Sequence, residues 1–142
     1  MENQFTENQD EIENQISYKI RKAIFEVIKV LGPGLLESIY EEALYRELMD
    51  MGLEVKRQQK LNVIYKNNLL DLYFRVDLIV EDKVIIEIKS IDQILDVHKS
   101  QVLTYLKLSG IPLGILVNFN TNFLRDNENI FRFILTKKHT SK

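Results

Sequence analysis

The segment 75–89 constrains the fold of this chain more than any other stretch. It reads as two apolar strands around a tight turn at residues 81–83, which places Val80 opposite Val84. In this register one face of the hairpin is apolar throughout, with Val76, Leu78, Val80, Val84, Ile86 and Ile88. The segment therefore predicts an antiparallel pair of strands within a covered sheet.

The other face of the hairpin places two acidic side chains directly opposite each other, Asp77 and Glu87. Two carboxylates in this position repel each other unless a positive charge lies between them. A divalent cation with oxygen ligands would supply that charge, and Lys89 lies on the same face. A solvated face with a few ion pairs is the alternative. Because Ile79 and Ile85 continue this face and must be covered, we favour a metal site at the edge of a covered layer.

Composition limits the remaining choices. With 142 residues and 45% hydrophobic content, we expect one domain over residues 1–142, with flexible tails at about 1–10 and 136–142. The absence of cysteine excludes disulfides, thiolate zinc sites and cysteine nucleophiles, and fits a cytoplasmic location. No apolar run approaches the roughly 20 residues of a membrane span.

The net charge of −2 gives no overall attraction to nucleic acid, so a polyanion would have to be bound by local basic patches. Such patches are more often solvated surface than binding sites. The candidates are Lys56, Arg57 and Lys60; Lys99 and Lys107; and Lys137, Lys138 and His139.

Hydrophobic periodicity predicts helices and strands in a mixed order. Three helices are expected, the first ending at Leu31, the second near Gly52 and the third spanning 97–108. Extended segments are expected at 53–65, bent in its polar middle, and at 70–80, 84–90, 113–117 and 130–135. This order predicts an α/β fold in which helices pack on a mixed sheet.

Several motifs on these elements resemble known nucleases. Asp77, followed ten residues later by Glu87-Ile88-Lys89, resembles the core of the PD-(D/E)XK nuclease superfamily, with Val76 in place of proline. The third helix carries Gln101-Val-Leu-Thr-Tyr105, which is similar to the Gln-x-x-x-Tyr motif of the RecB-type branch. With the two further motifs described next, four motifs occur in the right order on the right elements, which is a strong signal.

The other two motifs resemble the GxxExxY proteins of that superfamily. The segment 34–40 matches their signature, and the segment 114–119 also resembles them. The likeness spans roughly residues 14–135. It implies a restriction-endonuclease-like α/β core, in which a central mixed β-sheet is flanked by α-helices.

The resemblance implies Mg²⁺ or Mn²⁺ as cofactor, held by Asp77, Glu87 and the backbone carbonyl of Ile88. It also implies Glu37 as a third acidic residue of the site. Glu37 begins the second helix, so compensation of the helix dipole is its alternative role. Lys89 would stabilise charge on the phosphate, although a salt bridge to the carboxylates would explain it as well.

Two residues of the third helix complete the implied site. Gln101 would bind a metal-bound water or a substrate phosphate, and Tyr105 would support it or stack on a base. A core position is the alternative for Tyr105. Tyr40, on the same face as Glu37, is a further substrate-binding candidate. We expect the second and third helices to cover the same sheet face, which would bring Glu37 and Gln101 together.

The predicted function is metal-dependent hydrolysis of phosphodiester bonds, in DNA rather than RNA, without strong sequence specificity. The alternative is an inactive nuclease-fold module that binds nucleic acid or a protein partner through the same cleft. Joint retention of Asp77, Glu87, Lys89 and Gln101 favours the enzyme. A phosphatase or a sugar-acting enzyme fits less well, because Lys89 and the third helix would have no task. A homodimer remains open, and no membrane partner is expected.

Overall fold

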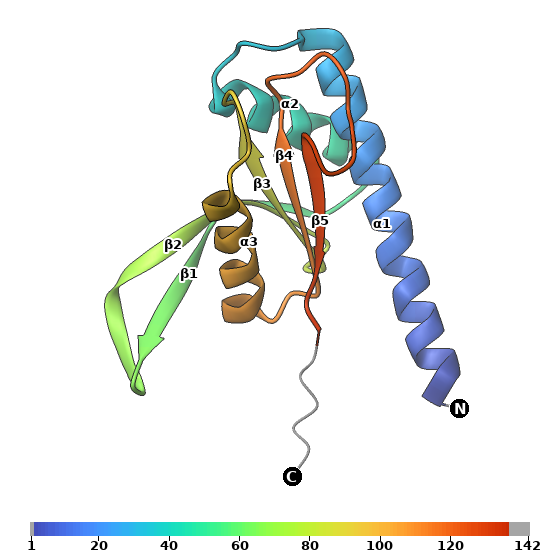
Figure 1. Cartoon of the computed structure of the whole chain (residues 1–142). Coiled ribbons are helices and arrows are strands. Elements are labelled where there is room, and N and C mark those ends of the chain that lie inside the picture. Colours follow the sequence, from blue (N-terminus) through green and yellow to red (C-terminus); the bar gives the residue numbers. More distant parts are fainter. Residues whose placement is uncertain (1, 137–142) are drawn as a thin grey trace.

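A computed structural model of the chain describes residues 2–136. Five strands form one sheet in the order β1-β2-β3-β4-β5, in which β3 and β4 are parallel and the other neighbours antiparallel (Figure 1). The helices are α1 (Glu2–Leu31), α2 (Glu37–Asp50) and α3 (Asp96–Ser109). The strands are β1 (Val55–Tyr65), β2 (Asn68–Val80), β3 (Val84–Lys89), β4 (Leu113–Asn118) and β5 (Ile130–Ile134).

The helices cover both faces of the sheet, as expected for this α/β fold. Helices α1 and α2 share one buried cluster with Leu78, Ile86 and Ile88 of β2 and β3. Helix α3 packs on the opposite face, against Ile79 and Ile85. Figure 1 shows the sheet between α1 and α3. The expectation that α2 and α3 cover the same face is therefore wrong.

The first helix is longer at its start than the sequence indicated. It begins at Glu2, whereas we expected fraying up to about residue 10. It ends as predicted at Leu31, and Gly32 follows with a positive φ of 68°. The residues predicted as a C-terminal tail lie outside the described part of the chain from position 137 onward. None of the described helices is long and apolar enough to cross a membrane.

Strands β1 and β2 form a long hairpin that extends beyond the rest of the sheet (Figure 1). Its two-residue turn has positive φ at Lys66 and Asn67, which suits a tight turn between antiparallel strands. Near the body of the protein the backbone is distorted at Gln58, whose φ is 49°. The predicted bend in the polar middle of this segment is thus confirmed.

Because of this distortion, the side chains of β2 do not keep to the same side of the sheet along the strand. Leu78 packs under α1 and α2, but Val76 belongs to the cluster on the α3 side, with Tyr105. In an undistorted strand, residues two apart lie on the same face. The prediction of one uninterrupted apolar face from Val76 to Ile88 is therefore wrong at Val76.

Close packing of α3 on β4 depends on Gly114. A Cβ atom at this position would lie 2.7 Å from Val102 Cγ1 and 3.3 Å from Leu106 Cδ2. We expect Gly114→Ala to lower the free energy of unfolding by about 1–3 kcal/mol, as for other overpacked cores. Chemical denaturation would measure this. The control Ser100→Ala, on the exposed side of α3, should change stability by less than about 0.5 kcal/mol, and equal effects would contradict the packing argument.

Candidate metal and catalytic site

The candidate site forms where β2 and β3 separate. Their ladder pairs Val80 with Val84 and ends at the pair Leu78–Ile86, in the register predicted from the sequence. One residue further along β2, Asp77 Oδ2 accepts a hydrogen bond from the backbone N–H of Ile88 at 2.8 Å. A side-chain carboxylate thus takes the position of a ladder carbonyl. It holds the two strands together while keeping its own charge at the opening.

Glu87 lies beside Asp77 and is almost fully buried, with 4% of its surface exposed. The pKa of Glu87 is raised to about 9, mainly by burial and also by a hydrogen bond to Asp77 and the negative charge of Asp77. The charge of Lys89 and a hydrogen bond from Tyr105 act in the opposite direction. At neutral pH and without a cation, Glu87 therefore holds a proton.

Asp77 also opens onto a cleft of about 240 Å³ on the α2 side of the sheet. The cleft is lined by Glu37, Ser38, Glu41, Gln58, Asp77 and Ile88. Glu37 is the first residue of α2, and its Oε1 lies 3.4 Å from the backbone nitrogen of Ser90, just after β3. The structure therefore brings Glu37 and Asp77, which are distant in sequence, to one cleft.

Tyr40 does not reach this cleft. It is fully buried, and its ring stacks on Phe119 with centroids 4.8 Å apart. Its hydroxyl donates to the carbonyl of Gly32 at 2.6 Å and accepts from the N–H of Leu35 at 3.1 Å. The expected contact of Tyr40 with substrate is therefore wrong. Tyr40 instead fixes the loop that leads into α2 and so positions Glu37.

The two candidates on α3, Gln101 and Tyr105, lie in different surroundings. Gln101 lines a different pocket of about 300 Å³, with Phe74 and Thr104 among its neighbours. Tyr105 is 2% exposed, and its ring centroid lies 5.5 Å from that of Phe74. Its hydroxyl is directed to Glu87. A buried ring cannot stack on a base, so the core alternative for Tyr105 is correct. Gln101 does not line the cleft of Asp77 and Glu37, contrary to expectation.

Comparison with known proteins agrees with the fold and with the superfamily that the sequence resembles. Residues 14–132 match the PD-(D/E)XK nuclease superfamily. The chain belongs to this superfamily. The structure entitled "Crystal structure of SSO0001" is similar, with 24% identity and a TM-score of 0.51, over 70% of this chain. This chain spans about half of that one (52%), and the likeness supports the fold alone. No curated protein matches the chain.

Sequence reasoning overlooked two residues that orient Asp77 in this PD-(D/E)XK protein. Glu41 is buried and accepts hydrogen bonds from Arg57 and Gln58. The side-chain amide nitrogen Nε2 of Gln58 also donates a hydrogen bond to Asp77 Oδ1 at 3.3 Å. Glu41 follows Glu37 by one helical turn, which could have indicated a shared cleft. The role of Gln58 follows from its distorted backbone, which strand periodicity does not reveal.

Asn118 is a third overlooked residue, and it anchors the loop after β3. It is the neighbour of Lys89 in the parallel ladder and is buried. Its side-chain amide donates to the carbonyl of Ile91 at 2.8 Å and accepts from the N–H of Ile91 at 3.1 Å. These two bonds fix the chain directly beyond Lys89. The base of the Lys89 side chain is therefore held beside the carboxyl pair.

The raised pKa of Glu87 predicts a pH dependence of stability in metal-free protein. Between the ordinary pKa of 4.5 and about 9, the folded protein binds more protons than the unfolded chain. Stability should therefore fall as pH rises through this window, by up to about 1.4 kcal/mol per pH unit for one proton. Denaturation in EDTA at several pH values would measure the slope.

Glu87→Gln removes the titrating group but keeps its shape, so this variant should lose most of the slope. Asp50→Asn removes an exposed carboxylate at the far end of α2 and should retain it. Identical pH profiles for wild type and Glu87→Gln would show that Glu87 has an ordinary pKa.

Proposed function

We propose that this PD-(D/E)XK protein is a metal-dependent nuclease that hydrolyses phosphodiester bonds in DNA without strong sequence specificity. The observation that carries the proposal is the contact between the carboxyl groups of Asp77 and Glu87 beside the charge of Lys89. Buried carboxyl groups in contact are destabilising for a fold and need a proton or a cation between them. Their presence at the motif of a nuclease superfamily supports a catalytic role.

The donor set fits a hard divalent cation. Asp77, Glu87 and the carbonyl of Ile88 would hold Mg²⁺ or Mn²⁺, and Glu37 would contribute from the cleft wall. Among residues 2–136, no three acidic or histidine side chains gather closely enough to form a cage by themselves. An open site that leaves positions for water and phosphate matches this arrangement. When bound, the cation would lower the pKa of water and neutralise charge on the phosphate.

The protein's own groups would perform the remaining tasks. Tyr105 donates to Glu87 and keeps that carboxylate oriented. The N–H of Ile88 and the amide of Gln58 orient the two oxygens of Asp77. Lys89 would stabilise negative charge that develops on the phosphate during hydrolysis. These contacts are made within the protein itself, which reduces the reorganisation needed in the transition state.

An inactive nuclease-fold module is the second candidate, and the position of Gln101 favours it. The polar side chain that the motif would supply to substrate lies in a separate pocket. Such a module would use the same cleft to bind nucleic acid or a protein. The two candidates differ in cleavage but not necessarily in binding.

Cleavage by matched variants tests the enzyme directly. Wild-type protein with Mn²⁺ or Mg²⁺ should degrade DNA, and EDTA should abolish this. Asp77→Asn and Glu87→Gln should stay folded and lose activity by orders of magnitude, because each removes a charged ligand. Lys89→Met should bind metal but cleave poorly. Asp50→Asn, purified in the same way, should cleave like wild type and controls for contaminating nuclease.

Two results would decide against the enzyme. An inert wild type on single- and double-stranded DNA and RNA, with either metal, would favour the inactive module. Cleavage by Glu87→Gln at the wild-type rate would assign the activity to another site or another protein.

Metal binding can be tested independently of activity. Mn²⁺ should raise the melting temperature of the wild type. At one hundred times its Kd, the cation should add about 2.7 kcal/mol to the free energy of unfolding. The increase should be larger at pH 8 than at pH 6, because the cation must displace the proton of Glu87. Asp77→Asn should lose the increase and Asp50→Asn should keep it. An equal increase in Asp77→Asn would place the bound metal elsewhere.

A further inference from the structure

We infer that the exposed face of the β1–β2 hairpin binds the phosphodiester backbone of nucleic acid and leads it to the cleft at Asp77. This inference rests on the proposed nuclease function and names the surface that holds its substrate. The surface consists of Lys60, Asn62, Tyr73 and Arg75, here called the hairpin track. All four side chains are exposed.

The hairpin track starts at the candidate site. Lys60 lies opposite Arg75 in the ladder, and Asn62 lies opposite Tyr73. Residues two apart along a strand share a face. Phe74 and Val76 both pack on the α3 side, so Arg75 between them, and Lys60 opposite Arg75, face the other side of the sheet, onto which the cleft opens. Since Gln58 and Asp77 line the cleft, the track continues the cleft along the hairpin.

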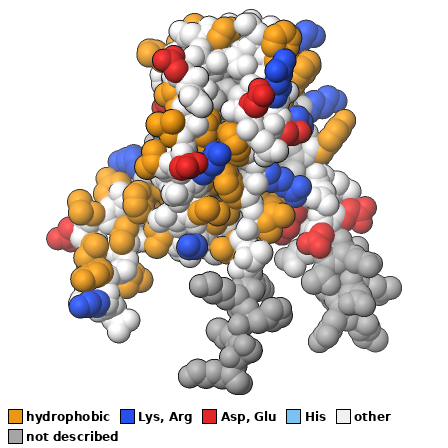
Figure 2. Space-filling model, viewed as in Figure 1, with side chains coloured by type: hydrophobic (Ala, Val, Ile, Leu, Met, Phe, Trp, Pro, Cys, Tyr) orange, Lys and Arg blue, Asp and Glu red, His pale blue; other side chains and the backbone are white. Residues whose placement is uncertain are grey.

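The opposite side of the hairpin is occupied near its base. Leu61 and Phe74 pack against the cluster that contains Tyr105 and α3. This packing fixes the base of the hairpin on the body and turns the track away from α3. The rest of the hairpin projects from the sheet, and hydrophobic side chains gather over it (Figures 1 and 2).

The charges of the track are available to a partner. Lys60 Nζ lies 4.2 Å from the ring centroid of Tyr73, and the guanidinium of Arg75 lies 5.5 Å from it. In the described part of the chain, neither cation forms an ion pair with a carboxylate.

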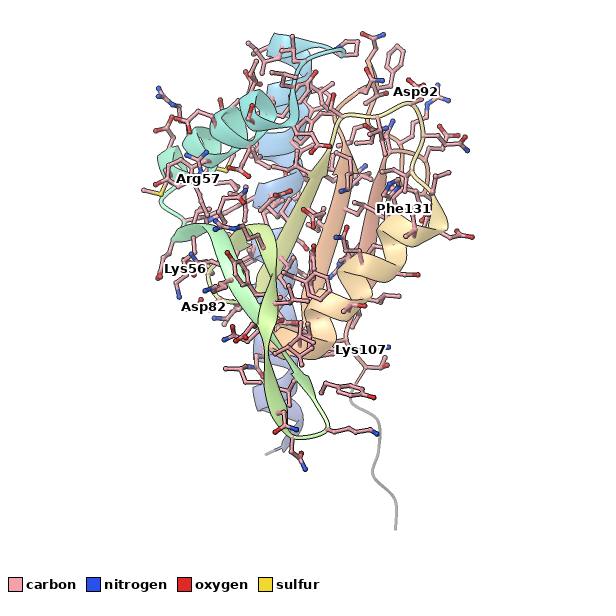
Figure 3. All side chains as sticks on the ribbon, turned by 90° about the vertical axis from the view of Figure 1, so that its left-hand side faces the viewer. Lys56, Arg57, Asp82, Asp92, Lys107 and Phe131 are labelled. Carbon is pink, nitrogen blue, oxygen red and sulfur yellow. The ribbon has the colours of Figure 1, made fainter. Side chains whose placement is uncertain are left out.

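Nearby basic residues of β1 behave differently from the track. Lys56 pairs with Asp82, and Arg57 pairs with Glu41 and Glu42. Figure 3 shows Lys56 beside Asp82, with Arg57 nearby. The local charges of Lys56 and Arg57 are therefore neutralised, whereas those of Lys60 and Arg75 are not.

The chemistry of the track fits nucleic acid better than a second protein chain. Between residues 59 and 75 the hairpin carries Lys60, Lys66 and Arg75 against one acidic residue, Asp71. The whole chain has a net charge of −2, so a polyanion needs such a local positive surface. Lys60 and Arg75 both lie over the ring of Tyr73, which holds the two cations close together on the track.

Binding of fluorescein-labelled DNA, measured by fluorescence anisotropy in EDTA, tests the track without cleavage. The double variant Lys60→Ala/Arg75→Ala should bind more weakly than wild type. The slope of log K against log salt should become shallower by about 1.8 for a duplex, because two phosphate contacts are lost. The control Lys22→Ala/Lys29→Ala removes the same charge from exposed positions of α1 and should leave the slope unchanged.

Cleavage by the same proteins separates this inference from the proposed function. Lys60→Ala/Arg75→Ala should raise KM with little change in kcat, since both residues lie outside the carboxyl pair. If wild type cleaves DNA and this variant binds and cleaves like wild type, the inference is overturned while the nuclease stands. If wild type binds but does not cleave, and the variant loses binding, the inference holds and the nuclease fails.

Two further outcomes would also overturn the inference. In the first, the control double variant loses as much affinity as the track variant, so that only overall charge matters. In the second, sedimentation velocity without DNA shows that Lys60→Ala/Arg75→Ala changes the oligomeric state. The hairpin would then be a contact between copies of this chain. Melting temperatures should match for all variants, since every substituted side chain is exposed.

Discussion

The hydrogen bond from the N–H of Ile88 to the carboxylate of Asp77 sets the geometry of the whole site. It replaces a backbone ladder bond at the point where β2 leaves β3. A charged acceptor makes this bond stronger than the amide–carbonyl bond it replaces. The strands can therefore separate without leaving a buried N–H unpaired, and the cleft opens in the gap.

Two features next to this bond destabilise the fold. Glu87 lies buried against Asp77, and only a proton on Glu87 or a cation between the two groups removes their repulsion. The positive φ of Gln58 adds backbone strain at the same place. The apolar clusters on both faces of the sheet offset these costs. Local conflict inside a consistent fold is expected at functional sites.

The order of elements and the hairpin register could be predicted because they depend on local patterns. Alternation around residues 81–83 fixes the pairing of Val80 with Val84, and Gly110 ends α3 in a left-handed conformation. The motif also placed Asp77 and Glu87 in contact, since cross-strand neighbours follow from register. These parts of the site needed no tertiary information.

The errors arise where distant contacts decide the outcome. Val76 changes face because β1 and β2 twist at Gln58, and period two contains no sign of such a twist. Helix α2 packs beside α1 on the face of Leu78, and nothing in its own sequence specifies which face it covers. Gln101 is consequently separated from Glu37 by the thickness of the sheet. The burial of Tyr40 depends on Phe119, almost eighty positions later.

The segment from Gly32 to Tyr40 acts as one unit rather than as a set of ligands. Gly32 supplies the left-handed residue after α1, and its carbonyl accepts the hydroxyl of Tyr40. That bond fixes the turn into α2, so Glu37 begins the helix facing the end of β3. Because Tyr40 stacks on Phe119, next to β4, the position of Glu37 is tied to the centre of the sheet. Of the two candidates that the segment 34–40 supplies, Glu37 lines the cleft, whereas Tyr40 fixes the loop before it.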